Sequence, residues 1–271
     1  MSSDKKKIWA ELRREVEADA HEEPILASFL YAAVLNHATF EEALSFHLAA
    51  KLASPTLHAI TLRDVMVAAH GRDHQIAEAA IADLKAIRER DPACRKYSTP
   101  FLYFKGFHAL QSYRVAHSLW KEGRESLALQ LQSRISEVFA VDIHPAARIG
   151  RGILMDHATS VVIGETAVVD DDVSILHEVT LGGTGKEQGD RHPKIRRGVL
   201  IAAGAKILGN IVIGEGAKVG GGSVVLHNVA PHTTVAGVPA KPVGKPHVAQ
   251  PSKSMDQQIE DDPDFVPDYM I

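Results

Sequence analysis

An aliphatic residue recurs at every sixth position through much of the C-terminal half of the chain. The recurring residues are Ile143, Ile149, Met155, Ile163, Val169, Ile175, Leu181, Ile195, Ile201, Ile207, Ile213, Val219 and Val225. No helix has a six-residue period, and the alternation of a single strand does not extend over about ninety residues. We therefore predict a three-sided prism, in which each hexad forms one short strand and one corner and stacked 18-residue coils pair through their backbones.

Small or β-branched residues usually stand four positions after each aliphatic anchor, as at Ala147, Thr159, Ala167 and Ala205. We expect the aliphatic anchors to point inward and these small residues to fit the tight bends between strands. The six-residue repeat is interrupted twice, between Met155 and Ile163 and again between Leu181 and Ile195.

The N-terminal half has a different texture. From Ile8 to about Phe139 it is rich in Ala, Leu, Glu, Arg and Lys and poor in Gly, which favours helices. Its last predicted helix carries an apolar stripe of Leu127, Leu131, Ile135 and Val138. We predict an α+β protein, with a helical domain over residues 1–140, a parallel β-helix over 141–244 and a flexible acidic tail over 245–271.

Composition narrows the class of protein. The formal net charge is −4, so nothing indicates a nucleic-acid partner, and the segment from Met255 onward carries six acidic residues and no Lys or Arg. The lone cysteine, Cys94, cannot form an intrachain disulfide, which favours a reducing compartment. The N-terminus lacks the apolar stretch of a signal peptide, and the longest apolar run, residues 25–35, is too short to span a bilayer. We expect a cytoplasmic protein without a membrane partner.

The second interruption of the repeat is a polar, glycine-rich segment from Gly182 to Lys194, which we expect to leave the prism as a loop. It does not fit a P-loop, because neither Ser nor Thr follows Lys186 and no Gly stands five residues before Gly185. The chain has no H-E-x-x-H and no C-x-x-C, so spacing does not suggest a metal site.

His157 is the histidine that the sequence favours as a general base. It lies beside the first interruption, next to Asp156, and Asp142 stands fifteen residues earlier, close to one coil. A carboxylate that orients an imidazole makes a general base near neutral pH. The alternative is that Asp142 caps the start of the first coil and that Asp156 and His157 form a polar turn. His192, beside Arg191 in the loop, is a second candidate, with a solvated loop residue as its alternative.

Several short stretches resemble the bacterial serine O-acetyltransferase family. They are Asp91-Pro92-Ala93 with Lys96-Tyr97-Ser98-Thr99-Pro100, Lys105-Gly106-Phe107-His108-Ala109-Leu110, Asp142-Ile143-His144-Pro145-Ala146-Ala147, Asp156-His157-Ala158-Thr159, Leu181-Gly182-Gly183-Thr184-Gly185-Lys186, Asp190-Arg191-His192-Pro193-Lys194-Ile195 and Ala236-Gly237-Val238-Pro239-Ala240. The resemblance covers nearly the whole chain, and it implies a left-handed β-helix. It also implies transfer of acetyl from acetyl-CoA to the hydroxyl of L-serine, the activating step of cysteine synthesis.

The resemblance assigns roles to individual residues. His157 is the general base and Asp142 orients it. Asp91 and Asp156 hold the substrate ammonium, Arg191 holds the carboxylate, and His192 lies against the substrate. The residues expected to bind acetyl-CoA are Ala203, Gly204, Lys218, Gly221, Gly222 and Lys241, the two lysines meeting phosphates; for the glycines, corner geometry is the alternative. No obvious acyl-enzyme nucleophile is present, so we predict direct transfer without a metal.

The resemblance also implies partners. Prisms trimerise with sites between them, and helical domains join two trimers into a homohexamer. L-cysteine inhibits at the serine site, and the terminal Ile271 inserts into O-acetylserine sulfhydrylase.

Three other functions remain open from the residues. A sugar acyltransferase fits the prism, although a sugar has no use for the opposite charges of Asp91 and Arg191. A trimeric β-helix carbonic anhydrase requires three zinc histidines, which a metal analysis tests. A non-catalytic scaffold leaves the polar loop and His157 unexplained.

Overall fold

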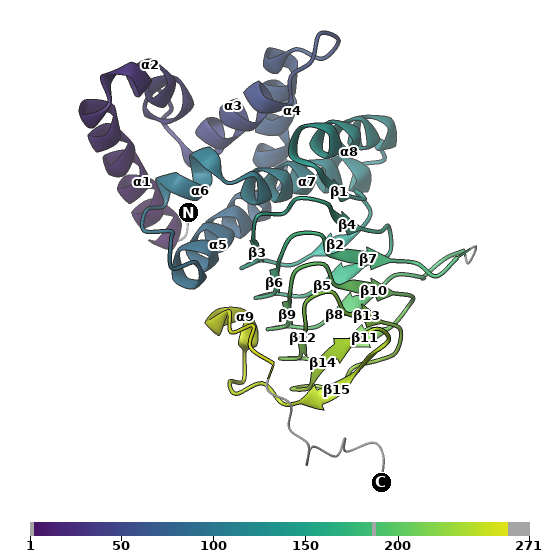
Figure 1. Ribbon diagram of the computed structural model, residues 1–271. Coiled ribbons are helices and arrows are strands. Elements are labelled where there is room, and N and C mark those ends of the chain that lie inside the picture. Colours follow the sequence, from purple (N-terminus) through teal and green to yellow (C-terminus); the bar gives the residue numbers. More distant parts are fainter. Residues whose placement is uncertain (1–2, 186–187, 260–271) are drawn as a thin grey trace. The chain divides into compact units, whose positions relative to one another are not determined.

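The computed structural model describes residues 3–185 and 188–259, and the chain divides into two compact units between Phe139 and Ala140. The first unit is helical (Figure 1). Its elements are α1 (Ser3–Glu22), the 3-10 helix η1 (Pro24–Leu26), α2 (Ala27–Leu30), the π-helix η2 (Tyr31–Leu35), α3 (Phe40–Leu52), α4 (Ala59–Arg72), α5 (His74–Arg90), α6 (Ser98–Tyr103), α7 (Lys105–Lys121) and α8 (Glu125–Phe139).

The helical unit has an aromatic core between α3, α6 and α7. His47 of α3 and His108 of α7 lie in it, 3% and 1% exposed, with ring centroids 5.0 Å apart. Each ring is satisfied by a carbonyl: His47 Nε2 lies 3.2 Å from the oxygen of Leu102, and His108 Nε2 lies 2.8 Å from that of Phe101. These bonds allow two polar rings to be buried among phenylalanines.

The apolar stripe of α8 differs from the predicted one at its end. Leu131 and Ile135 are buried as expected, but Val138 is 38% exposed and Phe139 is 4% exposed. The larger ring at the end of the helix takes the inward position.

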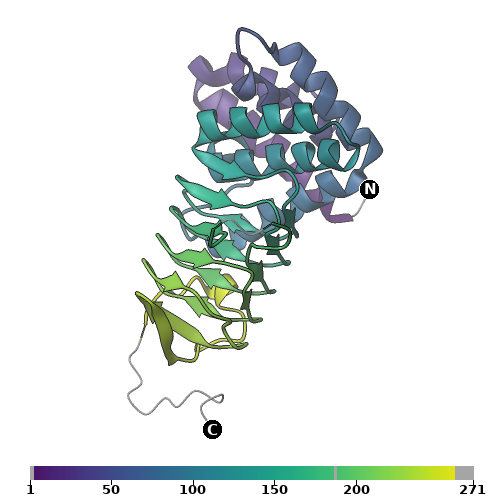
Figure 2. The ribbon, with the colours of Figure 1, turned by 90° about the vertical axis from the view of Figure 1, so that its right-hand side faces the viewer.

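The second unit is the predicted parallel β-helix (Figure 2). Its strands are β1 (Val141–Ile143), β2 (Arg148–Ile149), β3 (Leu154–Met155), β4 (Val161–Ile163), β5 (Val168–Val169), β6 (Ser174–Ile175), β7 (Thr180–Gly182), β8 (Lys194–Ile195), β9 (Leu200–Ile201), β10 (Lys206–Leu208), β11 (Val212–Ile213), β12 (Lys218–Val219), β13 (Val224–Val225), β14 (Thr234–Gly237) and β15 (Ala240–Gly244).

The strands form the three faces of the prism. Sheet A has the order β1-β4-β7-β10-β13, sheet B the order β11-β8-β5-β2, and sheet C the order β15-β14-β12-β9-β6-β3. All pairs between coils are parallel, while β14 and β15 close the last coil as an antiparallel hairpin. Twelve of the thirteen aliphatic anchors are buried, and Ile149, on the edge strand β2, is half-buried. The six-residue period therefore marks the inward face of the prism.

The first part of the predicted tail, which begins at Lys245, contains regular structure. A short helix, α9 (Pro251–Ser254), packs on β9, and the carbonyl of Ser252 accepts a 2.8 Å hydrogen bond from Ser174 Oγ. Ser252 is fully buried, so this part of the segment lies against the prism. Ile271 lies outside the described residues.

The buried histidines predict acid sensitivity of the helical unit. Burial lowers the pKa of His47 to about 4 and that of His108 well below its usual value. The unfolded chain therefore binds protons that the folded chain does not. The stability that these rings confer is complete above the unfolded pKa near 6.5 and is lost as the pH falls towards about 4. At pH 5 we expect His47 alone to lower the free energy of unfolding by about 2 kcal/mol.

Urea unfolding at fixed protein concentration, at about pH 7.5 and about pH 5, measures this loss. His47→Gln retains a side-chain N–H but no longer titrates, so it should reduce the pH dependence, whereas His21→Gln at an exposed position should not. Equal pH dependence in wild type and His47→Gln would contradict the assignment.

Candidate active site

The first interruption of the repeat places His157 outside the prism. The turn between β3 and β4 takes two more residues than a hexad allows, and His157, Ala158 and Ser160 all have positive φ, at 53°, 60° and 60°. Backbone bonds hold this turn between its neighbours: Ser160 N–H donates to the carbonyl of Ala140, and Glu178 N–H donates to that of Thr159, both at 2.7 Å. Ala158 is buried and Thr159, which the spacing placed at the bend, is exposed, because the turn shifts the register by one residue.

The His157 side chain is 75% exposed, and its Nε2 lies 3.9 Å from Asp156 Oδ2. Non-glycine residues with positive φ are strained, and such strain is concentrated at functional sites. The turn thus presents an imidazole to solvent, beside a carboxylate, on a rigid support.

Corresponding corners of successive coils form a column below His157. We call residues 156–160, 176–178, 202–204 and 220–222 the His157 column. The rings of His157 and His177 are 5.9 Å apart between centroids and nearly perpendicular. Gly204 N–H donates to the carbonyl of His177 at 3.0 Å, and Gly222 N–H donates to that of Ala203 at 2.8 Å. The column connects His157 to four of the six residues predicted to bind acetyl-CoA.

Backbone conformation requires glycine at some positions of this column and not at others. Gly204 and Gly222 have φ of 73° and 66°, so the corner geometry favours glycine at both. Gly221 does not have a positive φ, and a Cβ there would meet the carbonyl oxygen of Ala203 at an ordinary 3.4 Å. The packing of the chain therefore does not require Gly221, and its small size leaves open space on the outside of the column.

The second group of predicted residues lies on a different corner, between sheets A and B. We call residues 164–166 and 189–194 the loop corner. Arg191 donates to Glu165 Oε2 at 2.6 Å and to the carbonyl of Gly189 at 3.0 Å. The hydrogen bond from Arg191 lowers the pKa of Glu165. His192 is 7% exposed, and burial, followed by the charge of Arg191, lowers its pKa.

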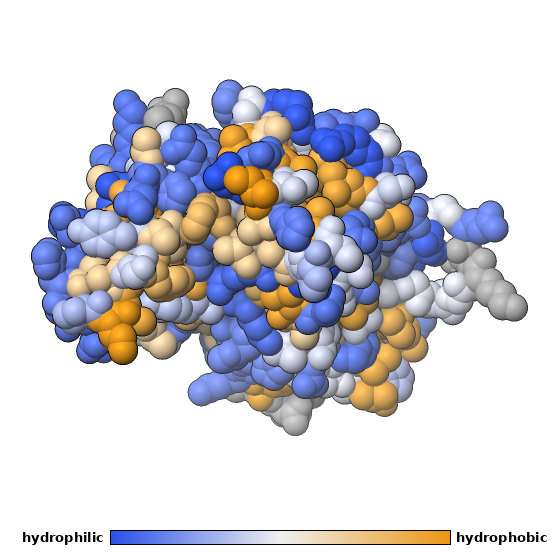
Figure 3. Space-filling model, turned by 90° about the horizontal axis from the view of Figure 1, so that it is seen from above, coloured by the Kyte–Doolittle hydropathy of each residue, from blue (hydrophilic) through white to orange (hydrophobic). Residues whose placement is uncertain are grey.

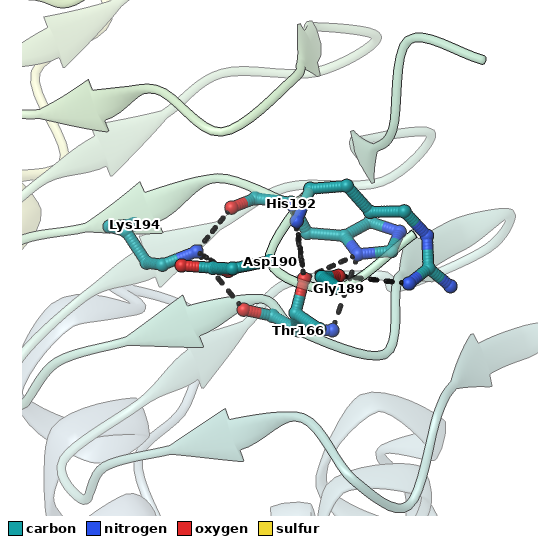
Figure 4. Close-up of polar contacts among 6 residues, drawn as sticks. Thr166, Gly189, Asp190, His192 and Lys194 are labelled. Atoms are coloured by element: carbon teal, nitrogen blue, oxygen red, sulfur yellow. Dashed lines mark hydrogen bonds and ion pairs between the residues drawn. The ribbon is translucent and has the colours of Figure 1, made fainter. Parts of the chain in front are cut away.

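Lys194 fastens the end of the loop (Figure 4). Its Nζ donates to the carbonyls of Thr166 and His192 at 3.2 and 2.5 Å and to Asp190 Oδ1 at 2.6 Å. The bond from Lys194 lowers the pKa of Asp190. The charged loop thus returns to the prism in a defined conformation.

The remaining predicted polar residues lie in separate places. Asp142 is on β1, between the buried Val141 and Ile143, and pairs in register with Val162. The His157 column lies at the corner between sheets C and A, whereas the loop corner lies between sheets A and B. Asp91 ends α5 in the helical unit, where its Oδ1 accepts a 2.8 Å bond from Ala93 N–H.

The two predicted phosphate-binding lysines have unlike surroundings. Lys218 is 3% exposed, and its Nζ donates to the carbonyls of Gln258 and Asp256 at 2.6 and 3.3 Å. Asp256 and Gln258 thus bind the ammonium group of Lys218, which the resemblance assigns to a phosphate of acetyl-CoA. Lys241 on β15 is exposed and borders an open hollow of about 310 Å³ that Val225, His227 and Val235 also line.

Cys94 is buried, and burial raises the pKa of its thiol to about 11. A thiol with so high a pKa is almost entirely protonated near neutral pH and is a poor nucleophile.

The described residues were compared with the requirements of a metal site and of a membrane-spanning helix. No group of three or more His, Cys, Asp or Glu side chains is arranged to hold a metal ion there. None of the helices in residues 3–185 and 188–259 has the length and apolar character needed to cross a membrane.

The structure adds residues that the sequence did not single out. His177 follows His157 by twenty residues, which is one coil plus the two extra residues of the first interruption. The spacing in the sequence could therefore have placed His177 beside His157. Glu165 and Thr166 follow the anchor Ile163, but their contacts to the loop depend on how a long insertion returns, and no periodicity encodes that.

Comparison with known proteins identifies the family of this chain. Residues 192–227 match the family described as bacterial transferase hexapeptide (six repeats), which places the prism among the hexapeptide transferases. Residues 8–112 match the family described as serine acetyltransferase, N-terminal. A serine acetyltransferase from Salmonella typhimurium is 60% identical over 252 residues, which cover 93% of this chain and 92% of the relative. The chain belongs to the serine acetyltransferase family, and it is an enzyme of the acyltransferase class.

Solved structures of relatives carry ligands. Soybean serine acetyltransferase complexed with serine is 59% identical, with a TM-score of 0.88, and the match covers 90% of this chain and 100% of that one. Serine acetyltransferase from Brucella abortus in complex with coenzyme A is 51% identical, with a TM-score of 0.87 and coverage of 88% and 96%. A serine acetyltransferase in complex with cysteine is 53% identical, with a TM-score of 0.93 and coverage of 94% and 100%.

Proposed function

We propose that the protein transfers the acetyl group of acetyl-CoA directly to the hydroxyl of L-serine, giving O-acetyl-L-serine and CoA, with His157 as general base. The observation that carries this proposal is the His157 column. It places an exposed imidazole in line with the small residues Ala203, Gly204, Gly221 and Gly222. Relatives that bind serine and coenzyme A support the choice of substrates.

The proposed reaction needs one base and one electrophile. His157 takes the proton of the serine hydroxyl as that oxygen attacks the thioester carbonyl. The tetrahedral intermediate then collapses with loss of the CoA thiolate, and the imidazolium returns its proton to the sulfur. N–H groups of the Gly182–Gly183 turn are our candidates to stabilise the oxyanion.

Direct transfer is supported by the state of the only cysteine. Cys94 is buried, and the pKa of its thiol is raised to about 11, so it is a poor acceptor for an acetyl group. No acyl-enzyme step is needed when both substrates bind beside His157.

The loop corner is suited to the carboxylate of a free amino acid. Arg191 is a charged donor, and His192 lies next to it with a lowered pKa. On the resemblance alone, we assign Asp91 and Asp156 to the substrate ammonium. A pair of opposite charges at fixed separation selects an amino acid against a simple alcohol or a sugar. L-cysteine has the same ammonium and carboxylate, so we propose that it inhibits by occupying this site, as the cysteine-bound relative suggests.

A complete site requires more than one chain. His157 and the loop corner lie on different corners of one prism. In a closed ring of prisms, each corner faces a different corner of its neighbour, so a heterologous interface brings unlike residues together. We propose a trimer in which one prism supplies the His157 column and the next supplies the loop corner, with Asp142 orienting His157.

The helical unit supports a further step of assembly. It exposes large apolar side chains in its first half, including Ile25 at 88%, Phe29 at 40% and Tyr31 at 45%. The space-filling view shows apolar residues gathered between hydrophilic ones on the upper face (Figure 3). Such patches are typical of protein interfaces. We propose that helical units join two trimers into a hexamer.

The proposed CoA site includes Lys218 and Lys241. Exposed Lys241 is accessible to a phosphate, whereas Lys218 must first exchange the carbonyls of Asp256 and Gln258 for it. We therefore expect residues 256–259 to shift when CoA binds.

Replacement of His157 tests the proposed mechanism. We expect His157→Ala to lower kcat for L-serine-dependent release of CoA by about 10²- to 10⁴-fold, because the hydroxyl loses its base. His58→Ala, at an exposed position of the helical unit, is the matched control and should retain full activity. Thiol release from acetyl-CoA measures both, with L-serine against other alcohols. A rate that is independent of L-serine, or full activity of His157→Ala, would refute the proposal.

The proposed partner of the C-terminus is O-acetylserine sulfhydrylase, bound through Ile271, which lies outside the described residues. The proposal rests on the resemblance of Tyr269-Met270-Ile271 to the family's tail. Deletion of Ile271 should abolish capture of the sulfhydrylase in a pull-down and leave acetyl transfer unchanged. Capture of the sulfhydrylase at the wild-type level by the shortened chain would refute the proposed role of Ile271.

A further inference from the structure

Within the loop corner, Thr166 holds residues 191 and 192 against the prism by hydrogen bonds. It lies between β4 and β5, and its Oγ1 accepts hydrogen bonds from the backbone N–H groups of Arg191 at 3.0 Å and His192 at 3.1 Å. Figure 4 shows Thr166 beneath the loop, facing His192. One hydroxyl thus orients two successive residues that the proposed function assigns to substrate.

The same threonine determines which nitrogen of His192 carries the proton. Thr166 N–H donates to His192 Nδ1 at 3.2 Å. A backbone N–H only donates, so Nδ1 is an acceptor and carries no hydrogen. Thr166 Oγ1 lies 2.9 Å from Nδ1 and already accepts two N–H groups, and its own hydrogen has two acceptors in reach, Nδ1 and the carboxylate of Asp190. In the neutral ring the proton is therefore on Nε2.

The protonated nitrogen is available to a ligand. In the described chain no residue accepts from His192 Nε2, and this atom is not among the buried side-chain nitrogens and oxygens without a partner. The Cδ2–Nε2 edge of the ring lies against Gly164, where an added Cβ would be only 2.0 Å from both atoms. The glycine thus leaves room for the ring in this orientation.

We propose that Thr166 is a positioning residue that holds His192 as a neutral Nε2–H donor beside Arg191, so that the two side chains together receive a carboxylate. The inference rests on the proposed function, in which that carboxylate belongs to L-serine. A histidine with the opposite tautomer would present a lone pair to the carboxylate and repel it. Thr166 therefore contributes to the recognition of an amino acid without touching it.

The kinetic test compares two substitutions at position 166. Thr166→Val removes the hydroxyl and leaves two backbone N–H groups without an acceptor, whereas Thr166→Ser retains the hydroxyl. Because hydrogen bonds to charged groups are strong, we expect Thr166→Val to raise KM for L-serine roughly ten- to a hundredfold, with KM for acetyl-CoA changed less than about twofold. Thr166→Ser should remain close to wild type. L-serinamide lacks the carboxylate, so its KM should change little in Thr166→Val.

A second measurement reads the tautomer without any substrate. Solid-state NMR of the ligand-free protein labelled with ¹⁵N-histidine separates protonated from unprotonated ring nitrogens, and the signals absent from His192→Gln identify His192. We expect an unprotonated Nδ1 and a protonated Nε2 in wild type and in Thr166→Ser. In Thr166→Val the N–H groups of Arg191 and His192 lose their bonds to Oγ1, so we expect His192 to move away from the N–H of residue 166 and to show a mixture of tautomers.

A protonated Nδ1 in the wild type would overturn the inference, and so would a Thr166→Val protein with an unchanged tautomer and an unchanged KM for L-serine. If the protein does not acetylate L-serine, the proposed function fails, and the NMR result still decides the role of Thr166.

Discussion

The parallel pairing of one coil with the next is the constraint on which the rest of the β-helix depends. Val141 pairs with Val161 and Ile163 with Leu181, and the same register continues through Ile207 to Val225. Because side chains alternate between the two faces of a strand, a shift of one residue would turn the aliphatic anchors outward. The buried core therefore fixes the register, and the register aligns the corners in columns. The geometry of the candidate site follows from that alignment.

The two interruptions of the six-residue period place the polar side chains of the candidate site on the outside of the prism. At the first, two extra residues allow three positive-φ positions and place His157 in solvent. At the second, the chain leaves sheet A after Gly182 and returns to sheet B at Lys194 with Arg191 and His192 beside Thr166. The described parts of both departures are held by hydrogen bonds to neighbouring coils.

Much of this could be predicted from the sequence, because a strict period leaves few alternatives. The anchors, the three sheets they form and the two interruptions could all be identified from the sequence, and twelve of the thirteen anchors are buried. Other features depend on tertiary contacts that no period encodes. Ala158 rather than Thr159 is buried because of the conformation of one turn, Phe139 replaces Val138 at the end of α8, and Lys218 is covered by residues 256–259. The tautomer of His192 depends on a contact with a residue 26 positions away.

In the proposed assembly, one chain supplies the His157 column of each active site and a neighbouring chain supplies its loop corner. Co-expression of His157→Ala and Arg191→Ala chains, each inactive alone, tests it directly. If sites are shared between neighbouring chains, random mixing leaves about one quarter of the sites with both intact halves, so acetyl transfer to L-serine should recover to about one quarter of the wild-type rate. Mixed assemblies as inactive as either parent would contradict the claim and place the whole site within one chain.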